Sequence, residues 1–310
     1  MNIKNIETKN DIKEILESQN YIPSMEIVYT LYNAIKLKMP ILIEGPAGTG
    51  KTELSKVLRD ALGLELIRMQ CYEGLDASKT IYEWDYSKQM LLTQIMQPFF
   101  KEKLDGVTSP EEAVKIIGGG SAFYNEDFLL ERPLLQSIAS DEQSILLIDE
   151  LDKADEEFEA LLLEFLGEFS VTIPEYQTIK CKEGNEPIVI LTSNSKRELS
   201  DALKRRCAYL YIDYPTETLE AEIIEKKANV DSEFALKVAK AVARIRNLDR
   251  VKQKPSISES IVWAQSLILN LGVENFNSMN KEEIDLTLSI LLKNKKDIDS
   301  VKASAYLSSF

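Results

Sequence analysis

The chain has 310 residues, of which 44% are hydrophobic and 28% are charged, enough for one large or two modest globular domains. It contains no histidine, which excludes Ser-His-Asp and Cys-His catalysis and any metal site with histidine ligands. The net charge of −14 disfavours binding to nucleic acid or to anionic lipid.

The sequence lacks the signs of export or membrane insertion. No apolar run is long enough to span a membrane, and the first residues lack the apolar core of a secretory signal. Cys71, Cys181 and Cys207 are widely spaced and fit neither a disulfide framework nor a metal-ligand pattern. We therefore expect reduced thiols and a cytoplasmic protein that does not act on membranes.

Two short helices are predicted at the start of the chain. The first covers residues 11–20, and Ser24 is placed to cap the second, which carries its apolar residues at helical spacing. The break Tyr21-Ile22-Pro23 separates them. Tyr21 and Ile22 could contact an adenine ring or simply anchor the second helix, and the residues alone favour simple packing.

A complete phosphate-binding loop follows, between a short apolar strand at 40–43 and the start of a helical pattern. Its glycines let the backbone wrap around phosphate oxygens, and the helix N-terminus adds partial positive charge. Lys51 is placed to reach the β- and γ-phosphates, and Thr52 to ligate Mg²⁺. The loop therefore predicts binding of a nucleoside triphosphate, with ATP and Mg²⁺ as the expected cofactors. The expected nucleotide-binding residues are Gly45, Pro46, Ala47, Gly48, Thr49, Gly50, Lys51, Thr52 and Glu53.

The next hundred residues are less specific. Residues 64–69 are predicted to form a second strand. Alternation over residues 80–86 predicts a small hairpin, whose aromatic side chains would either form a contact surface or pack on the domain. A helix is expected over 89–104, a glycine turn at 118–120, and a short helix after 128–135.

The segment 144–150 consists of an apolar run followed by two acids. This pattern is typical of a buried parallel strand with carboxylates at its C-terminal end, where open α/β sheets bind ligands. Asp149 is placed to hold the Mg²⁺ shell, and Glu150 to activate a water for attack on the γ-phosphate. The pattern is weak alone, but the preceding phosphate loop makes it specific.

Two polar features follow a predicted hairpin with arms at 171–174 and 179–181. The apolar strand 188–192 leads to Asn194, whose amide can hydrogen-bond the γ-phosphate or the attacking water. Taken alone, the motif is better explained by an asparagine that ends a strand in a turn. Arg205 and Arg206 are either solvated surface residues or an arginine finger for a neighbouring subunit.

Strand patterns stop near Pro215. The fold class predicted for residues 1–214 is α/β, a P-loop NTPase with a parallel sheet flanked by helices. Residues 215–310 are predicted to form a smaller, all-helical lid domain. Its helical patterns cover 217–227, 232–247, 258–270, 281–292 and about 297–307.

The order of these motifs resembles an AAA+ ATPase and, within that superfamily, the MoxR family. The likeness favours the branch whose genes accompany von Willebrand factor A-domain proteins, including carbon monoxide dehydrogenase maturation ATPases. It runs from about Tyr21 to at least Ala264. The segments that carry it are QCYEGLD at 70–76, YEWDY at 82–86, RPLL at 132–135, LIDELDKAD at 147–155, TSN at 192–194 and ELSDALKRRC at 198–207.

The resemblance implies roles that spacing does not show. Asn194 matches the sensor-1 residue, and Arg206 best matches the arginine finger, with Arg205 as the second choice. Tyr21 and Ile22 gain weight as adenine contacts. The inserts near 71–88 and 169–187 correspond to family inserts that face a pore or a partner. A finger acting in trans implies a homo-oligomeric ring, most often a hexamer.

The lid departs from the pattern of many AAA+ proteins, which carry a sensor-2 arginine there. The matching stretch, 254–263, has no arginine at the expected place. Lys252 or Lys254 could substitute, or the contact could be absent. This departure leaves open how tightly the nucleotide state is coupled to the lid.

These observations favour an ATP-hydrolysing ring that remodels or activates a protein in a chaperone-like manner, in metalloenzyme maturation or complex assembly. A von Willebrand factor A-domain protein and a client are the partners implied. A nucleotide-dependent binding switch with slow turnover is the main alternative. A nucleic-acid motor is disfavoured by the net charge of −14 and by the lack of a helix-turn-helix or zinc module. A P-loop kinase would need an acceptor pocket, whereas the Asp-Glu pair suits water.

Overall fold

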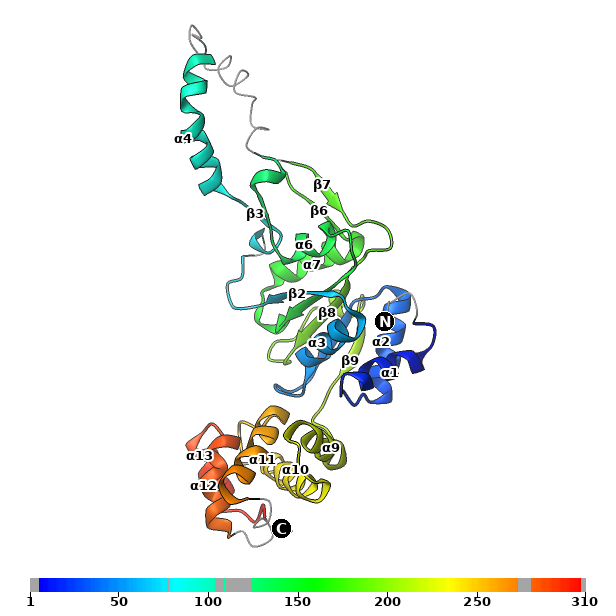
Figure 1. Cartoon of the computed structure of the whole chain (residues 1–310), viewed down its shortest axis with the longest axis vertical. Helices are drawn as coiled ribbons and strands as arrows, with labels where there is room; N and C mark the ends of the chain where they lie inside the picture. The colour runs from blue at the N-terminus through cyan, green and yellow to red at the C-terminus, as the bar shows by residue number, and fades with distance from the viewer. Residues whose placement is uncertain are drawn as a thin grey trace. The chain divides into compact units, whose positions relative to one another are not determined.

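The structure is a computed structural model that describes residues 6–76, 78–103, 109, 124–174, 176–272 and 280–307. The turn expected at 118–120 lies outside these ranges. The described residues form two compact units, and Figure 1 labels the helices and strands. The first is drawn from residues 1–30, 43–62 and 210–310, and the second from 31–42 and 63–209. The domain boundary expected at residue 214 stays a prediction.

The five-stranded sheet has the order β2-β5-β8-β1-β9. It is parallel, which confirms the predicted fold class of a P-loop NTPase sheet with flanking helices. Its central strands are buried along their whole length, as their continuous apolar runs require. The strands are β1 (Ile41–Glu44), β2 (Glu65–Gln70), β5 (Ser144–Asp149), β8 (Ile188–Ser193) and β9 (Ala208–Tyr211).

Helices connect these strands and cover the sheet. The hydroxyl of Ser24 accepts the N–H of Ile27 (3.3 Å), which confirms Ser24 as the cap of α2. In the second unit, the apolar face of α7 packs into the core through Phe158, Leu162 and Phe165. The helices of this part are α1 (Lys9–Ser18), α2 (Met25–Leu37), α3 (Lys51–Leu62), α6 (Pro133–Ala139), α7 (Glu156–Glu168) and α8 (Asp201–Lys204).

Two small antiparallel sheets accompany the main one. β6 (Ser170–Thr172) and β7 (Thr178–Lys180) confirm the second predicted hairpin. The hairpin expected within 80–86 is wrong, because β3 (Tyr82–Trp84) pairs with β4 (Leu129–Glu131). There is no room for a return arm, since the Asp85 carboxylate accepts the Lys88 N–H (2.9 Å) and a helix begins at once. Trp84 packs in the core rather than forming a contact surface.

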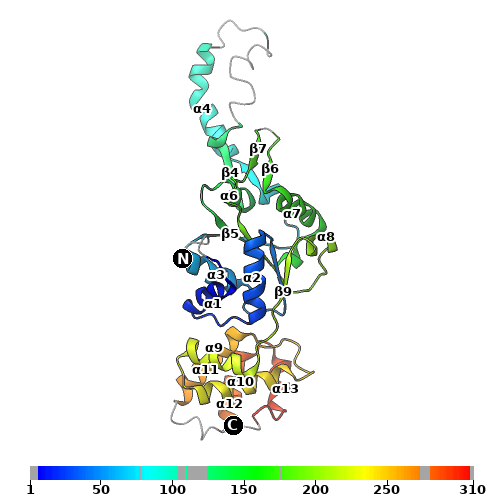
Figure 2. The same cartoon turned by 90° about the vertical axis from the view of Figure 1, so that its right-hand side faces the viewer.

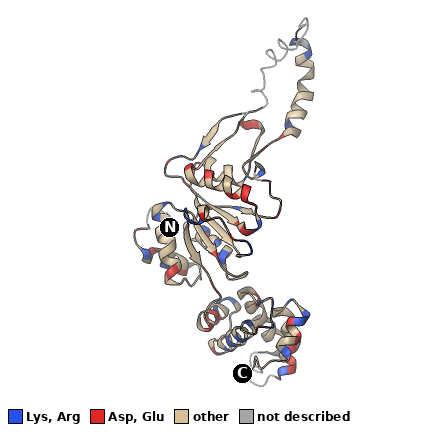
Figure 3. Ribbon diagram, turned by 180° about the vertical axis from the view of Figure 1, so that it is seen from behind, with Lys and Arg blue, Asp and Glu red and all other residues tan. Residues whose placement is uncertain are grey.

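That helix, α4 (Tyr86–Lys103), begins three residues before the predicted start. It carries several exposed large apolar side chains and few charged residues, so Figure 3 shows it almost entirely tan. Within the described ranges no helix, α4 included, combines the length and apolarity needed to cross a membrane. The exposed apolar residues of α4 are Tyr86, Met90, Leu91, Leu92, Ile95 and Phe99.

The C-terminal helices follow the five predicted patterns closely, apart from a shorter last helix, and are drawn in yellow to red in Figure 2. A side-chain oxygen accepts a backbone N–H at the start of each one. Their shared core centres on Trp263, which is fully buried and donates from Nε1 to the hydroxyl of Thr287 (2.8 Å). The helices are α9 (Glu217–Ala228), α10 (Ser232–Arg246), α11 (Ile257–Leu271), α12 (Lys281–Leu291) and α13 (Lys295–Lys302).

Candidate active site

The phosphate loop joins β1 to α3, as its sequence predicts. Gly45, Gly48 and Gly50 all have positive φ (151°, 77° and 91°). A Cβ added at Gly45 would lie 2.0 Å from the carbonyl oxygen of Ile212, and one at Gly48 would lie 2.1 Å from Cβ of Ser256. A Cβ at Gly50 would meet no atom within 4 Å, so this glycine is required by its backbone conformation. The loop therefore closely approaches the end of β9 and the start of α11.

Lys51 is the first residue of α3, and its ammonium group turns back into the loop. Nζ donates to the carbonyl oxygens of Gly45 (2.8 Å) and Pro46 (2.6 Å), and the residue is only 6% exposed. The hydroxyl of Thr49 also donates to Pro46 (3.0 Å). A buried cation surrounded by loop backbone is suited to phosphate oxygens.

A pocket of about 670 Å³ opens beside the loop in the first unit. Its volume is in the range of nucleotide and cofactor sites. Tyr21 and Ile22 line it together with Gly48–Gly50 and Glu53, so the structure brings these predicted residues to one cavity. Desolvation, and then the negative charge of Glu53, raise the pKa of Tyr21 to about 12. Its phenol is therefore a neutral hydrogen-bonding group at physiological pH.

The C-terminal helices supply one wall of this pocket. The N–H of Ile257, the first residue of α11, donates to the carbonyl oxygen of Gly48 (3.1 Å). Ser258 and Ile261 line the cavity, and so does Lys227 of α9. Neither Lys252 nor Lys254, the substitutes considered for a sensor-2 arginine, is among the described residues that line this wall. Lys227 was not predicted, because nothing in its local pattern distinguishes it from other surface lysines.

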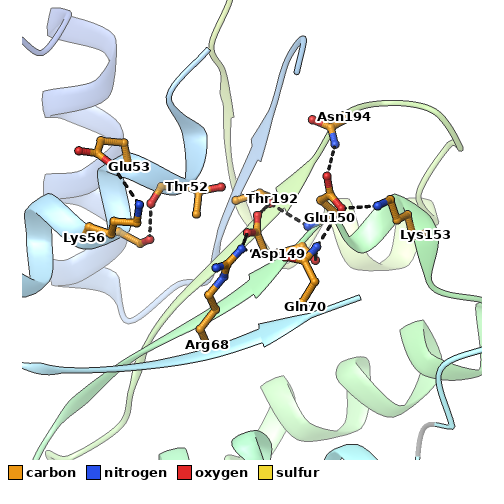
Figure 4. A network of polar contacts seen from close by, with 11 residues as sticks. Thr52, Glu53, Lys56, Arg68, Gln70, Asp149, Glu150, Lys153, Thr192 and Asn194 are labelled. Atoms are coloured by element: carbon orange, nitrogen blue, oxygen red, sulfur yellow. Dashed lines mark hydrogen bonds and ion pairs between the residues drawn. The ribbon is translucent and has the colours of Figure 1, made fainter. Parts of the chain in front are cut away.

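Asp149 and Glu150 end β5 in the second unit (Figure 4). Asp149 is 3% exposed, and both of its carboxylate oxygens accept hydrogen bonds. Thr192 donates its hydroxyl to Oδ1 (2.6 Å), and Arg68 donates from Nη2 to Oδ2 (2.6 Å). Thr192 also accepts the N–H of Glu150 (3.0 Å), so one hydroxyl fixes the backbone between the two acids.

The Glu150 carboxylate is held by three donors. Asn194 donates from Nδ2 to Oε1 (3.2 Å), and Gln70 donates from Nε2 to Oε2 (2.8 Å). Lys153 forms an ion pair with Oε2 (2.5 Å), and this pair raises the pKa of the Lys153 ammonium. Glu150 itself lies in the left-handed region at φ 56°, where non-glycine residues are rare outside functional sites.

Asn194 is thus beside Glu150, as expected if both residues position one water. Asp152 fixes this arrangement, since its buried carboxylate accepts the N–H of Asn194 (3.1 Å) and the N–H of Lys196 (3.2 Å). These bonds connect the turn after β8 to the turn after β5. This geometry favours a role for Asn194 in orienting a water over the alternative that Asn194 merely ends a strand in a turn.

Arg68, Gln70 and Lys153 are polar neighbours that the sequence analysis missed. Arg68 and Gln70 occupy exposed positions of β2 that alternate with the buried Ile67 and Met69. The alternation was readable from the sequence, but the neighbour of β2 was not. The structure pairs Gln70 with Asp149 in the parallel register of β2 and β5.

Arg205 and Arg206 follow α8, and both are exposed. Nη1 of Arg206 donates to the carbonyl oxygen of Leu163 in α7, so its guanidinium is held on its own chain. Arg205 is the C-cap of α8. The finger assignment remains a prediction for either residue.

The donor chemistry fits magnesium. The buried carboxylate of Asp149, in the second unit, and the hydroxyl of Thr52, in the first, are each hard oxygen ligands of the kind that Mg²⁺ prefers. That the two residues share one ion stays a prediction. Among the described residues, no group of three or more His, Cys, Asp or Glu side chains could hold a metal alone.

Comparisons with known proteins agree with this geometry. A family model described as AAA domain (dynein-related subfamily) matches residues 40–207. The chain is 24% identical over 235 residues to Protein CbbQ of Hydrogenophilus thermoluteolus, covering 74% of each chain. It is 20% identical over 270 residues to Protein NorQ of Paracoccus denitrificans, covering 85% of this chain and 86% of NorQ.

A third relative is much longer. The chain is 30% identical over 161 residues to Chaperone protein ClpB of Chlamydia caviae, a match that covers 52% of this chain. The matched region is only 15% of ClpB, so the chain corresponds to a small part of that protein.

Proposed function

Since the chain belongs to the dynein-related subfamily of AAA domains and is an ATPase of the MoxR type, we propose that it uses ATP hydrolysis to remodel or activate a protein partner. The observation that carries the hydrolytic part is the pairing of Asn194 with Glu150. A carboxylate and an amide at the end of a parallel strand can together orient a water. A phosphate acceptor other than water would need a second substrate site.

In this mechanism a water attacks the γ-phosphate in line with the leaving group. Glu150 accepts a proton from the water, and the amide of Asn194 holds it in position. Lys51 lies inside the loop and supplies positive charge to the β- and γ-phosphates. When bound, Mg²⁺ neutralises charge on the phosphates, and Thr52 and Asp149 are the residues that would hold it. The pocket beside Tyr21 and Ile22 receives the base.

The surface of α4 supports a protein as the target. Met90, Ile95 and Phe99 are each about three-fifths exposed (66%, 59% and 60%). Apolar side chains gathered on one exposed helix mark a surface that another protein covers. One relative, ClpB, is a chaperone protein, which is in line with such a role.

The finer proposals concern assembly and location. We infer a ring, most often a hexamer, in which Arg206 or Arg205 of each subunit completes the neighbouring site. The partners proposed are a von Willebrand factor A-domain protein and a client, for which metalloenzyme maturation is one setting. Residues 1–214 would form the nucleotide domain and 215–310 the lid. The three free cysteines support a cytoplasmic location.

The Glu150→Gln variant tests the hydrolytic proposal. It should bind ATP but release phosphate at least about 100-fold more slowly, because it lacks the base. A fluorescent ATP analogue measures binding, and phosphate release measures turnover. Glu157→Gln, an exposed change at the start of α7, is the matched control and should behave as wild type. Wild-type turnover by Glu150→Gln would refute its role as the base.

A nucleotide-dependent binding switch remains the second candidate, favoured by one observation. The Glu150 carboxylate is bound at once by three side chains, those of Gln70, Lys153 and Asn194. These contacts restrain it from accepting a proton from a water. Slow basal turnover is the expected consequence. Turnover that rises when the partner is added would favour the remodelling function. ATP-dependent capture of the partner with unchanged slow turnover would favour the switch.

A further inference from the structure

The Asp149 carboxylate is buried at the end of β5, where an uncompensated negative charge is unfavourable. Arg68 compensates it through a short hydrogen bond from Nη2 to Oδ2 (2.6 Å). The two partners differ in exposure, since the side chain of Asp149 is 4% exposed and that of Arg68 is 51% exposed. The guanidinium can therefore move into solvent, whereas the carboxylate cannot.

The position of Arg68 is fixed by its neighbours. It stands two residues before Gln70 on the same face of β2, and Nη2 also donates to Oε1 of Gln70 (2.8 Å). Gln70 in turn holds Glu150 (2.8 Å). One face of β2 therefore contacts both acids that end β5. An ordinary surface ion pair joins two exposed side chains. The Arg68–Asp149 pair differs, because Asp149 is buried and Arg68 also donates to Gln70.

The metal and the guanidinium need the same carboxylate. Oδ1 of Asp149 accepts the Thr192 hydroxyl (2.6 Å), and Oδ2 accepts Arg68. A magnesium ion, or a water polarised by it, would approach this carboxylate with further positive charge. Two cations at one carboxylate in a poorly solvated site repel each other. Binding of the metal with nucleotide should then displace Arg68 from Asp149.

We propose that Arg68 is a positioning residue that occupies Asp149 in competition with magnesium. It keeps the carboxylate paired and correctly oriented before the metal arrives, and it lowers the affinity of the site for a divalent cation without nucleotide phosphates. The metal is then held firmly only together with ATP or ADP. This inference rests on the proposed magnesium role of Asp149 and assigns a function to β2, an edge strand of the sheet.

The test measures metal binding rather than turnover. Mn²⁺ binding to the full chain, with and without ADP, is followed by electron paramagnetic resonance for wild type and Arg68→Met. Without the competing guanidinium, Arg68→Met should bind Mn²⁺ about tenfold more tightly, most clearly without ADP. Arg59→Met is the matched control, because Arg59 pairs with Asp60 on the surface (2.8 Å) and its loss removes the same charge. That control should leave Mn²⁺ affinity unchanged.

Other outcomes separate this inference from the proposed function. Equal or weaker Mn²⁺ binding by Arg68→Met would overturn the competition. Asp149→Asn tests the magnesium role itself and should lose Mn²⁺ binding; if it binds Mn²⁺ as wild type does, that role of Asp149 fails. Arg68→Lys provides a second variant if Arg68→Met does not fold. It keeps the charge but lacks the forked donors, and Mn²⁺ affinity no higher than wild type in a folded Arg68→Lys would also count against competition.

Discussion

At the scale of single residues, Cys71 shows how the acidic strand end affects its surroundings. The thiol is fully buried, and the Cys71 N–H donates to the carbonyl oxygen of Asp149 (2.9 Å). Burial, and then the negative charges of Asp149, Asp152 and Glu150, raise the pKa of Cys71 to about 12. Burial alone raises the pKa of Cys207 to about 12. Both thiols therefore stay protonated far above physiological pH.

The raised pKa values of these two thiols predict that the folded protein loses stability in alkaline solution. In the unfolded chain they ionise near the ordinary pKa of 9.0, whereas the folded chain keeps them protonated to about 12. The contribution of the two thiols to stability is fully present below pH 9 and is lost as pH rises from 9 toward 12. At pH 10 each thiol should lower the free energy of unfolding by about 1.4 kcal/mol. Urea unfolding at pH 7 and pH 10 measures this loss.

The double variant Cys71→Ala/Cys207→Ala is the control for this prediction. At pH 7 this variant is less stable than wild type, because the substitutions leave small cavities. Between pH 7 and pH 10, however, its free energy of unfolding should fall by about 3 kcal/mol less than that of wild type. Equal losses in both proteins would show that the folded thiols ionise as easily as the unfolded ones.

Local patterns predicted part of the candidate site. Three apolar strands can be recognised in the sequence, and each is followed by part of the site: the phosphate loop, the pair Asp149 and Glu150, and Asn194. Their position at the same edge of the sheet could be predicted, because parallel strands have their C-terminal ends at one edge. Arg68 and Gln70 could not be placed, because β2 lies beside β5 in the strand order and not beside β1, its predecessor in the chain. Strand neighbours depend on pairings far apart in sequence, which residue periodicity does not encode.

At the scale of elements, the C-terminal helices are organised around a buried ion pair. Arg246, at the end of α10, donates from Nη1 and Nη2 to both carboxylate oxygens of Glu220 in α9 (2.5 and 2.8 Å). Its Nε donates to the carbonyl oxygen of Pro255 (2.8 Å), just before α11. Glu220 is 0% and Arg246 5% exposed. The pair thus connects two helices to the turn that leads to the wall of the nucleotide pocket.

Breaking this pair should destabilise the protein strongly. Arg246→Met leaves the Glu220 carboxylate buried without its partner and should lower the free energy of unfolding by about 3–5 kcal/mol. The double variant Arg246→Met/Glu220→Met removes both charges and should recover much of that loss. Urea unfolding of the full chain measures both effects.

A more exposed pair on the same helix provides the comparison. Nζ of Lys237 lies 2.9 Å from Oε1 of Glu233, whose side chain is 75% exposed. Lys237→Met should therefore change the free energy of unfolding by less than about 1 kcal/mol. A double variant at Arg246 and Glu220 that is no more stable than the single one would mean that shape, rather than charge, makes this site essential.

Elements were predicted well where their signals are local. The lid helices have side-chain caps and apolar faces within their own sequence, so four of the five agree with prediction to within two residues at either end. β3 was assigned the wrong partner because β4 lies more than forty residues further along the chain. Aromatic alternation identified the strand but not the strand with which it pairs.

At the scale of the whole molecule, the proposed ring makes each active site the product of two subunits. Arg206 donates to the carbonyl oxygen of Leu163 in its own chain, so it must leave this contact to reach a neighbour. Arg205, the adjacent exposed arginine, is the second choice for the finger. A substitution in the finger should therefore damage the site of the next subunit rather than its own.

Mixing two inactive variants tests this arrangement. Arg206→Ala should hydrolyse ATP about 10³–10⁵ times more slowly while still binding it. Mixed in equal amounts with Glu150→Gln, it should recover about a quarter of wild-type activity. One neighbour pairing in four then joins an intact Glu150 to an intact Arg206. Phosphate release from the mixture and from each variant alone gives the result.

The same experiment with Arg205→Ala decides between the two arginines. Wild-type turnover by Arg206→Ala, together with complementation by Arg205→Ala, would transfer the finger to Arg205. If neither variant complements Glu150→Gln, the finger does not act between subunits.

The contact between the phosphate loop and the start of α11 has a consequence for folding. The pocket beside the phosphate loop, the proposed nucleotide site, is built from residues 19–27, 48–57, 211–227 and 257–261. A ligand there would join segments separated by more than 150 residues of chain. A bound nucleotide acts as a reversible cross-link that opposes opening of these segments. At a concentration one hundred times its Kd it would add about 2.7 kcal/mol to the free energy of unfolding. The supply of nucleotide would then set how long each molecule survives proteolysis, as well as how fast it works.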